Sequence, residues 1–446
     1  MNNDRRAFLK NTIKGTAAIS IGGMLPSFTA ASYSRIIGAN ERLNVGMMGV
    51  NSRGFALARS FAAQKNARVI SVSDVDIRAA EKCISEVEKI ASNKATSIPD
   101  FRKALESKDL DILAIAAPDH WHAPAAILAA KAGKNVYLEK PASHNPNEGE
   151  LLVRAALKYK TFIQMGNQRR SWPNIIQAMN ELHDGVIGRP YFAKTWYTNN
   201  RESIGIGQPA AVPSWLDYNL WQGPAPRKPY QDNLIHYNWH WFWNWGTGEA
   251  LNNGVHTIDL ARWGLRAEFP TRVTSAGGRY RYKDDWQTPD TQVITLEFNN
   301  NTSIAWEGRS CNGRSIEGAA VGCIFYGETG SLFIGEGNGY TIYDLDNKEI
   351  KKVTGEIIDA RNTTSPADQL DAIHIQNFLS AISKGTKMHS PIAEGHKSTL
   401  LCQLGNISLR SGNALKTDPG NGRIIGDKQA QQYWSRKYEP GWEPVI

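Results

Sequence analysis

The sequence predicts an α/β protein that begins with a parallel, doubly wound sheet and continues into an α+β domain with a large, mostly antiparallel sheet. Between Leu43 and about Met165, short apolar segments alternate with segments of helical periodicity. Beyond about Gly166, apolar and polar residues alternate as they do in antiparallel strands. The chain has 446 residues. A single core usually stops growing at roughly 250–300 residues, so two domains are expected.

The first domain is predicted over residues 40–165. Its strands are expected at Asn44–Gly49, Arg68–Ser73, Asp111–Ala116, Asn135–Glu139 and Phe162–Met165. Its helices are expected at Phe55–Gln64, Arg78–Ile90, Ala123–Ala132 and Asn147–Lys158. Strands and helices in this order form right-handed βαβ units, which produce a Rossmann-type parallel sheet.

The second domain is predicted over residues 166–446. Its strands are expected at Tyr191–Tyr197, Val273–Tyr280, Gln292–Phe298, Ser303–Trp306 and Gly322–Tyr326. Residues 201–237, between the first two strands, are rich in proline, glycine and tryptophan and show little periodicity. A stretch of this length without regular structure is usually functional, so we expect an active-site loop there.

A glycine turn joins the first strand to the first helix. Gly49 permits a tight turn and Gly54 lets the helix approach the sheet, so a pyrophosphate can bind at the helix N-terminus. Asp74 stands 20 residues past Gly54, and a carboxylate that binds the adenosine ribose is expected at about that distance. Asn51 replaces the middle glycine, and a turn without a ligand is the alternative. Asp74 favours NAD over NADP, although Arg78 is near enough to offset its charge.

The N-terminus has the pattern of an export signal. Residues 4–10 read DRRAFLK and precede a weakly apolar run over 16–25 and then small residues. This resembles a twin-arginine signal peptide over residues 1–31 with cleavage near Ala31, and a basic N-terminus without this role is the alternative. We therefore expect contact with the twin-arginine translocase and export to the periplasm.

Composition argues against several classes of function. Part of the net charge of +8 belongs to the signal segment, so no nucleic-acid surface is expected. No later apolar run approaches the ~18 residues of a membrane-spanning helix, so the mature chain is expected to be soluble. The four cysteines lack C-x-x-C spacing, and Cys311 and Cys323 either pair or remain isolated buried thiols. His120 and His122 have no third clustered ligand, so no metal is expected.

Lys140 and His256 have the chemistry for proton transfer. Lys140 follows the fifth predicted strand, at the sheet edge where ligands bind in open α/β folds, although it could also be a solvated loop residue. Asn252, His256 and Asp259 would share one face of a helix. His256 ordinarily titrates near neutrality and suits a general acid or base. A capped helix with a surface pair between Asp259 and Arg262 is the alternative.

Aromatic and basic residues indicate a substrate class. Every second residue of one segment is a tryptophan, at Trp239, Trp241, Trp243 and Trp245. In an extended segment these rings would share one face on which a sugar can stack, although they equally suit a core or an oligomer contact. Arg169 and Arg170 could hold an acidic sugar, and surface salt bridges are the alternative for each.

Taken together, these residues resemble the Gfo/Idh/MocA family of NAD(P)-dependent oxidoreductases. The resemblance runs through residues 49–54, 74, 118–122, 139–141, 166–170, 253–259 and 404–407. It implies that Lys140 and His256 flank the nicotinamide and the reacting carbinol, with Pro118 and His122 close to the cofactor. Family members often have Asp at the position of Asn252, which can orient a hydroxyl but cannot accept its proton.

The site expected from these arguments has three groups of residues. The catalytic residues are Lys140, His256 and Asn252. The cofactor-binding residues are Gly49, Asn51, Ser52, Arg53, Gly54, Asp74, Pro118, His120, His122, Glu139 and Lys140. The substrate-binding residues are Arg169, Arg170, Trp241 and Asp259. The cofactor is expected to be tightly bound NAD, with NADP as the alternative.

Three functions fit this site. The first is an exported oxidoreductase that transfers a hydride between a sugar or glycoside carbinol and the nicotinamide, while Lys140 or His256 handles the proton. The second resembles the NAD-dependent α-N-acetylgalactosaminidases, which oxidise the sugar transiently so that elimination cleaves the glycosidic bond; their histidine aligns with Asn253. The third is a carbohydrate-binding protein with a structural dinucleotide. The family resemblance also implies a homo-oligomer, a dimer or a tetramer.

Overall fold

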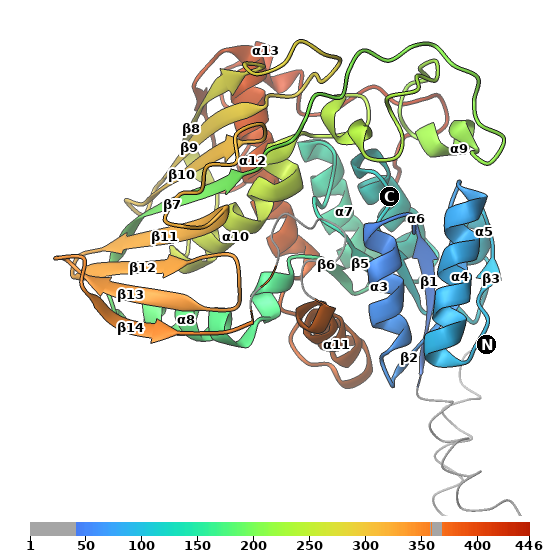
Figure 1. Ribbon diagram of the computed structural model, residues 1–446, viewed down its shortest axis with the longest axis horizontal. Coiled ribbons are helices and arrows are strands. Elements are labelled where there is room, and N and C mark those ends of the chain that lie inside the picture. Colours follow the sequence, from blue (N-terminus) through green and yellow to red (C-terminus); the bar gives the residue numbers. More distant parts are fainter. Residues whose placement is uncertain (1–41, 357, 359–367) are drawn as a thin grey trace, which may run out of the picture. The chain divides into compact units, whose positions relative to one another are not determined.

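The computed structural model describes residues 42–356, 358 and 368–446, and Figure 1 shows its two sheets. The predicted export signal over residues 1–31 lies outside the described residues. In the part of the chain that is described, no helix has both the length and the apolar character needed to cross a membrane.

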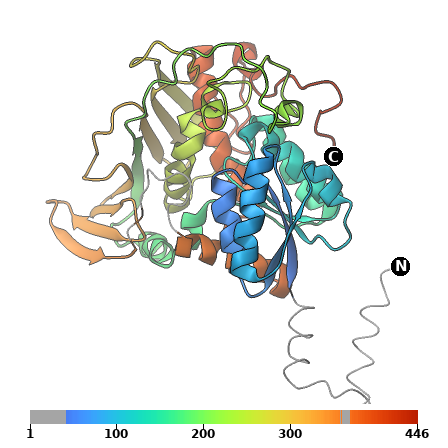
Figure 2. The same cartoon turned by 45° about the vertical axis from the view of Figure 1, so that its right-hand side comes forward.

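Six parallel strands form the first sheet, in the order β3-β2-β1-β4-β5-β6. They are β1 (Leu43–Met48), β2 (Ala67–Ser73), β3 (Thr96–Ser97), β4 (Ile112–Ile115), β5 (Asn135–Leu138) and β6 (Ile163–Met165). The helices between them are α3 (Arg53–Ala62), α4 (Ile77–Ala91), α5 (Phe101–Leu105), α6 (Asp119–Lys131) and α7 (Pro146–Tyr159). Figure 2 shows α3 and α4 together on one face of the sheet. The predicted Rossmann sheet is confirmed, and only the very short β3 and α5 were not predicted.

Helix α6 begins earlier than its sequence pattern predicts, at Asp119 instead of Ala123. Pro124 lies inside this helix and has no N–H to donate to the carbonyl oxygen of His120. The missing donor comes from the C-terminal segment, because Arg436 Nη2 donates to that oxygen at 2.7 Å. A distant arginine therefore satisfies the carbonyl that the proline leaves without its helical partner.

The second sheet has nine strands in the order β14-β13-β12-β11-β7-β10-β9-β8-β15. Neighbouring strands are antiparallel except β7 and β10, which are parallel. They are β7 (Pro190–Thr198), β8 (Pro270–Gly278), β9 (Thr291–Phe298), β10 (Ser303–Arg309), β11 (Val321–Gly327), β12 (Gly330–Ile334), β13 (Tyr340–Asp344), β14 (Glu349–Val353) and β15 (Leu415–Lys416). The mostly antiparallel sheet was predicted, with β7 to β11 near their expected positions.

The remaining helices pack on both sheets. They are α8 (Pro173–His183), α9 (Tyr218–Gln222), α10 (Val255–Gly264), α11 (Asp368–Lys384), α12 (Ile392–Ser411) and α13 (Lys428–Gln431), with short 3₁₀ helices η1 (Gln168–Ser171) and η2 (Asn238–Trp241) and a π-helical turn η3 (Ala250–Gly254). Helices α10 and α12 pack against the nine-stranded sheet. Helix α11 instead adds Ile375 and Phe378 to the core that contains Val45 and Leu57 of the parallel sheet. The chain thus returns to the parallel sheet after completing the second one, while the predicted boundary at residue 165 stays a prediction.

Candidate active site

Two adjoining cavities lie at the carboxyl ends of the parallel strands. The cofactor cleft, with an empty volume of about 790 Å³, is lined among others by Gly49, Asn51, Ser52, Asp74 and Pro118. The catalytic cavity, of about 1100 Å³, is lined among others by Arg53, His122, Glu139, Lys140, Arg169, Asn252 and His256. Both are lined by Ser52, Ala116, Ala117, Tyr237, Trp239 and His240, so the two cavities adjoin at these residues. The structure therefore brings most of the predicted site residues together.

The turn after β1 has no room for side chains at its two glycines. Gly49 has φ +78°, and a Cβ there would lie 2.7 Å from the backbone nitrogen of Ala117. A Cβ on Gly54 would lie 1.7 Å from the carbonyl oxygen of Gly49. The side chain of Ser52 does not cap α3, so it does not compete with an anion for the first N–H groups of the helix. This geometry fits a pyrophosphate at the N-terminus of α3.

Asp74 stands at the end of β2 and lines the cofactor cleft. Its Oδ2 accepts from the backbone N–H of Val50 at 2.6 Å and its Oδ1 from that of Asp76 at 2.8 Å. Burial raises the pKa of Asp74, while these two hydrogen bonds act in the opposite direction. A carboxylate has about four acceptor sites, so it can still accept bonds from ribose hydroxyls.

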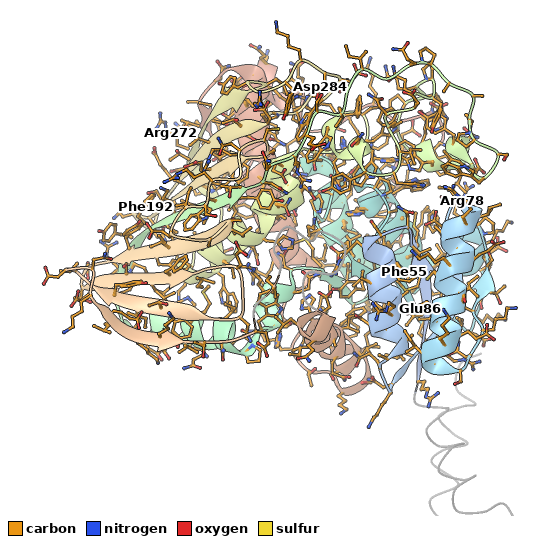
Figure 3. All side chains as sticks on the ribbon, viewed as in Figure 1. Phe55, Arg78, Glu86, Phe192, Arg272 and Asp284 are labelled. Atoms are coloured by element: carbon orange, nitrogen blue, oxygen red, sulfur yellow. The ribbon has the colours of Figure 1, made fainter. Side chains whose placement is uncertain are left out.

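Arg78 pairs with Asp76 and not with Asp74. Its Nη2 donates to Asp76 at 2.8 Å, and its guanidinium lies 3.6 Å from the ring centre of Trp215. Figure 3 labels Arg78 at the beginning of α4. Whether it moderates the preference for NAD over NADP stays a prediction.

Arg53, predicted to bind the cofactor, connects three parts of the chain. Its Nε donates to Glu139 at 2.9 Å and its Nη1 to Asp371 of α11 at 2.6 Å. Burial raises the pKa of Glu139, but Arg53 and Lys140 outweigh it and hold that pKa below its usual range. The glycine turn, the strand end that carries Lys140 and helix α11 are thereby joined at the catalytic cavity.

Lys140 is held by the π-helical turn. Its Nζ donates to the backbone oxygen of Asn252 at 2.6 Å and lies 3.2 Å from the Oδ1 of the same residue. Burial lowers the pKa of Lys140, and the charges of Glu139 and Asp119 oppose this only in part. An amine in this environment loses its proton more readily than a lysine in water. Asn252 thus positions the amine that the sequence identified as catalytic.

His256 lines the same cavity but does not titrate near neutrality, as the sequence-based argument assumed. Burial is the largest cause that brings its pKa well below 6.5, and the charges of Lys140, Arg169 and Arg53 lower it further. The imidazole is therefore neutral at pH 7. It can donate or accept a hydrogen bond at a substrate hydroxyl, which leaves Lys140 as the better group for proton exchange.

Arg170 and Asp259, predicted to bind substrate, form an ion pair away from both cavities. The Nε and Nη2 of Arg170 each donate to Asp259 at 2.8 Å, and both side chains are buried. Ser398 also donates to Asp259. Arg262 pairs with Glu394 instead, so the surface pair with Asp259 considered above does not form.

The four tryptophans do not share one face. Their segment forms the 3₁₀ helix η2 and a turn instead of an extended strand. Trp239 lines both cavities, with His240 stacked on it at 3.6 Å between ring centres. Trp241 is buried against Trp286, at 3.8 Å between ring centres, and lines neither cavity. The predicted sugar platform is thus reduced to Trp239, and the predicted contact of Trp241 with substrate is corrected.

His120 lies behind the wall of the cleft and lines neither cavity. Its Nε2 and Nδ1 lie 3.0 and 3.3 Å from the carbonyl oxygens of Trp221 and Trp245. Burial lowers its pKa to about 3, so the neutral ring connects α6 to the segment around those tryptophans. This structural role replaces the cofactor contact that the sequence predicted for it.

All four cysteines are free and buried, so they are isolated thiols and the pair of Cys311 with Cys323 does not form. Over residues 42–356, 358 and 368–446, no cluster of three or more His, Cys, Asp or Glu side chains could hold a metal ion.

Some residues of the catalytic cavity were not among the predicted site residues. They include Asp119, Trp172, Tyr197, Asn253 and Asp371. Asp119 and Asn253 lie inside the segments that carried the family resemblance, which is a signal that could have identified them. Asp371 comes from a helix far away in sequence, and no local pattern marks it.

Comparison with known proteins agrees with this geometry. Residues 43–167 match the description "Oxidoreductase family, NAD-binding Rossmann fold", and residues 194–443 match "Oxidoreductase family, C-terminal alpha/beta domain". An inositol 2-dehydrogenase of Rubrobacter xylanophilus is 27% identical over 399 residues, which cover 85% of this chain and 95% of that protein.

Two further relatives differ in what they share with the chain. A glycosyl hydrolase family 109 protein of Saccharopolyspora erythraea is 26% identical over 226 residues, 47% of this chain and 49% of that protein, so only about half of its length is matched. The structure of levoglucosan dehydrogenase in complex with NADH and levoglucosan has a TM-score of 0.65 at 19% identity, covering 84% of this chain and 99% of that one. At this identity the structural likeness shows the fold alone.

Proposed function

The chain belongs to the Gfo/Idh/MocA oxidoreductase family, and on that premise we propose that it is an exported enzyme that transfers a hydride between a sugar or glycoside carbinol and NAD. One observation carries the proposal. The side chain of Lys140 is held by Asn252, in a cavity that is also lined by His256 and adjoins the cofactor cleft. The relatives named for inositol and levoglucosan support a polyhydroxylated substrate.

The cleft fits a dinucleotide because Gly54 has no room for a Cβ and Asp74 retains acceptor capacity beside it. NAD, when bound, would supply or accept the hydride. The chain's own residues do the rest. In oxidation the Lys140 amine takes the hydroxyl proton, and in reduction its ammonium returns it. Neutral His256 hydrogen-bonds and orients the reacting alcohol, while the aromatic wall around Trp239 excludes water.

Tight retention of NAD is part of the proposal and rests on the segment from 201 to 245. Its residues Leu220, Trp221, His236, Tyr237, Trp239 and His240 line the cofactor cleft. Several contacts fasten it to the parallel sheet: Asp217 N–H donates to Val75 O at 3.0 Å, and His236 Nε2 lies 2.9 Å from Asp76 Oδ2. A dinucleotide in this cleft would leave only after these contacts opened.

Asp74→Asn is expected to relax the preference for NAD over NADP. The substitution keeps an acceptor for one backbone N–H but removes the charge that would repel a 2′-phosphate. We expect the ratio of NADP affinity to NAD affinity to rise about tenfold. A carboxylate about 4 Å from a 2′-phosphate would oppose binding by more than 1 kcal/mol, and the variant removes that repulsion. Titration of cofactor-stripped protein with each reduced dinucleotide measures the ratio. The exposed Asp109→Asn is the matched control, and an unchanged ratio in Asp74→Asn would contradict this role.

The pH dependence should follow Lys140. Oxidation requires the neutral amine, so its rate should rise with pH and reach half its maximum below 10.5, the ordinary lysine value, because burial lowers the pKa of Lys140. Reduction requires the ammonium, so its rate should fall over the same interval. Rates of both directions across the pH range check this, and a titration at or above 10.5 would argue against Lys140 as the base.

A second candidate is a glycosidase that oxidises the sugar transiently before elimination. The similarity to the glycosyl hydrolase family 109 protein favours it. The same amine could then remove the proton next to the new carbonyl. Asn253, which the resemblance aligns with a histidine of those glycosidases, donates to Glu249 and cannot act as a base. We therefore place this function second.

The first experiment identifies what the purified full-length chain holds. Small molecules are released by denaturation and identified by mass spectrometry, and sugars and glycosides are then added while the nicotinamide absorbance is followed. Tightly bound NAD that is reduced without glycosidic cleavage supports the proposal. Cleavage without accumulation of NADH supports the glycosidase. Bound NAD that no sugar reduces would support a carbohydrate-binding protein, and a chain that neither contains nor takes up the cofactor would overturn all three.

Export by the twin-arginine translocase and assembly into a dimer or tetramer are further parts of the proposal. Cell fractionation of the parent and of the Arg5→Lys/Arg6→Lys variant tests export. If the signal is used, the variant should lose the periplasmic form. Light scattering on the purified chain tests assembly.

A further inference from the structure

Arg169 is a buried cation on the wall of the catalytic cavity. It is the second residue of η1, the 3₁₀ helix that follows β6, and it is only 6% exposed. Its Nη1 donates to the carbonyl oxygen of Gly335 at 3.0 Å and its Nη2 to that of Glu336 at 2.9 Å. A guanidinium has five N–H donors, so these two bonds fix its orientation and leave other donors available.

The charge of Arg169 is not balanced in the way its neighbours' charges are. Arg53 is paired with Glu139 and Asp371, and Arg170 with Asp259. Among the described residues, no carboxylate forms an ion pair with Arg169, whose guanidinium donates to two carbonyl oxygens. The acid next to its carbonyl partners, Glu336, directs its Oε1 to the backbone N–H of Ala320 instead.

Within the described residues, the charge of Arg169 therefore lacks a balancing anion. Burial lowers the pKa of Arg169 to about 10, with Cys323 and Glu336 opposing it only weakly. It still carries its charge at neutral pH. A buried charge without a counterion is costly, and one that faces a cavity can be compensated by a bound ligand.

Two more donors that have no hydrogen-bond partner among the described residues line the same cavity. Trp172, whose ring lies 5.2 Å from the guanidinium carbon of Arg169, has an Nε1 without a hydrogen-bond partner. The hydroxyl of Tyr237, which lines both cavities, also has none. The catalytic cavity therefore offers two further hydrogen-bond donors in addition to the guanidinium of Arg169.

We propose that Arg169 binds a carboxylate of the substrate, and that the sugar is a uronic acid or a glycoside of one. The inference rests on the proposed oxidoreduction and names its substrate class. Lys140 and His256 would meet the carbinol, while Arg169 holds the carboxylate at another position of the same molecule. A carboxylate suits the site better than a phosphate, because one guanidinium neutralises a monoanion but leaves half of a dianion's charge uncompensated.

The test compares matched pairs of sugars on the NAD-loaded protein. Glucose, galactose and mannose are each compared with their uronic acids, both free and as methyl glycosides, and sugar 6-phosphates form a third arm. The single-turnover rate at which each sugar reduces the bound cofactor is compared within each pair, and calorimetry on protein loaded with NADH measures binding of each uronic acid without its oxidation. For at least one pair we expect the uronic acid to exceed the neutral sugar about 10- to 100-fold, as one charge-assisted hydrogen-bonded pair contributes.

Arg169→Gln should bring that ratio close to one and abolish calorimetric binding of the uronic acid. Arg169→Lys, which keeps the charge but loses the planar fork, should restore part of the ratio. Arg189→Gln, an exposed arginine paired with Glu328, controls for net charge and should change nothing. Retained NAD in each variant shows that it folds.

Each outcome decides between the two proposals. Neutral sugars that react as well as their uronic acids, or a preference that persists in Arg169→Gln, would overturn the inference and leave the oxidoreductase intact. A clear preference for 6-phosphates would also overturn it. Uronic acids that bind through Arg169 without reducing the cofactor would support the inference and count against the oxidoreductase.

Discussion

Replacing Lys140 with alanine is expected to slow reduction of the bound cofactor by about 10²- to 10⁴-fold, the usual contribution of a positioned acid or base, while NAD remains bound. Burial lowers the pKa of this amine, so it loses its proton more readily. Its Nζ donates to the backbone oxygen of Asn252 at 2.6 Å. Alanine removes this amine but leaves the turn at Gly54 and the carboxylate of Asp74 unchanged. Stopped-flow absorbance measures the rate, and mass spectrometry of the denatured variant measures the retained NAD.

Lys131→Ala is the matched control, because this exposed lysine at the end of α6 lies on the same domain but lines neither cavity. It should retain both NAD and full rate. If Lys140→Ala loses NAD, the residue is structural and its catalytic assignment fails. If it keeps both NAD and rate, proton transfer belongs to another group, and His256 becomes the first candidate despite its lowered pKa.

The sequence predicted the parts of the site that local geometry determines. A strand followed by a glycine turn and a helix has few solutions, so Gly49, Gly54 and Asp74 could be placed from spacing alone. Lys140 was found because the residue after a parallel strand reaches the ligand-binding edge of the sheet. Asn252 and His256 were predicted to face the same side because residues four positions apart lie on one face of a helix, and both line the catalytic cavity.

Contacts between distant segments could not be predicted in the same way. Arg53 and Asp371 are separated by 318 positions, and only the return of α11 to the parallel sheet brings them together. The prediction that the tryptophan segment is extended was wrong for a related reason. Its alternating pattern resembles a strand, but stacking of Trp241 on Trp286 and the close approach of Gly246 to the backbone of His240 favour a tight turn. Tertiary packing therefore decided a conformation that the local pattern left open.

The same limit applies to Arg170 and Asp259, which the sequence assigned to the substrate and the structure buries together. Arg170→Leu is expected to lower the free energy of unfolding by about 3–5 kcal/mol, because it leaves the carboxylate of Asp259 buried without its cation. Ser398 still donates to this carboxylate in the variant. Chemical denaturation followed by circular dichroism measures the loss.

The double variant Arg170→Leu/Asp259→Leu distinguishes the cost of an unpaired buried charge from the cost of changing the side chains themselves. Two apolar side chains leave no buried charge, so the double variant should recover much of the stability that the single variant loses. Arg189→Leu breaks an exposed ion pair with Glu328 and should change stability by no more than about 0.5 kcal/mol. If Arg170→Leu is as stable as the parent but binds sugar more weakly, Arg170 contacts the substrate as the sequence predicted. A large loss of stability with recovery in the double variant would instead leave Arg169 as the member of this arginine pair that faces the substrate.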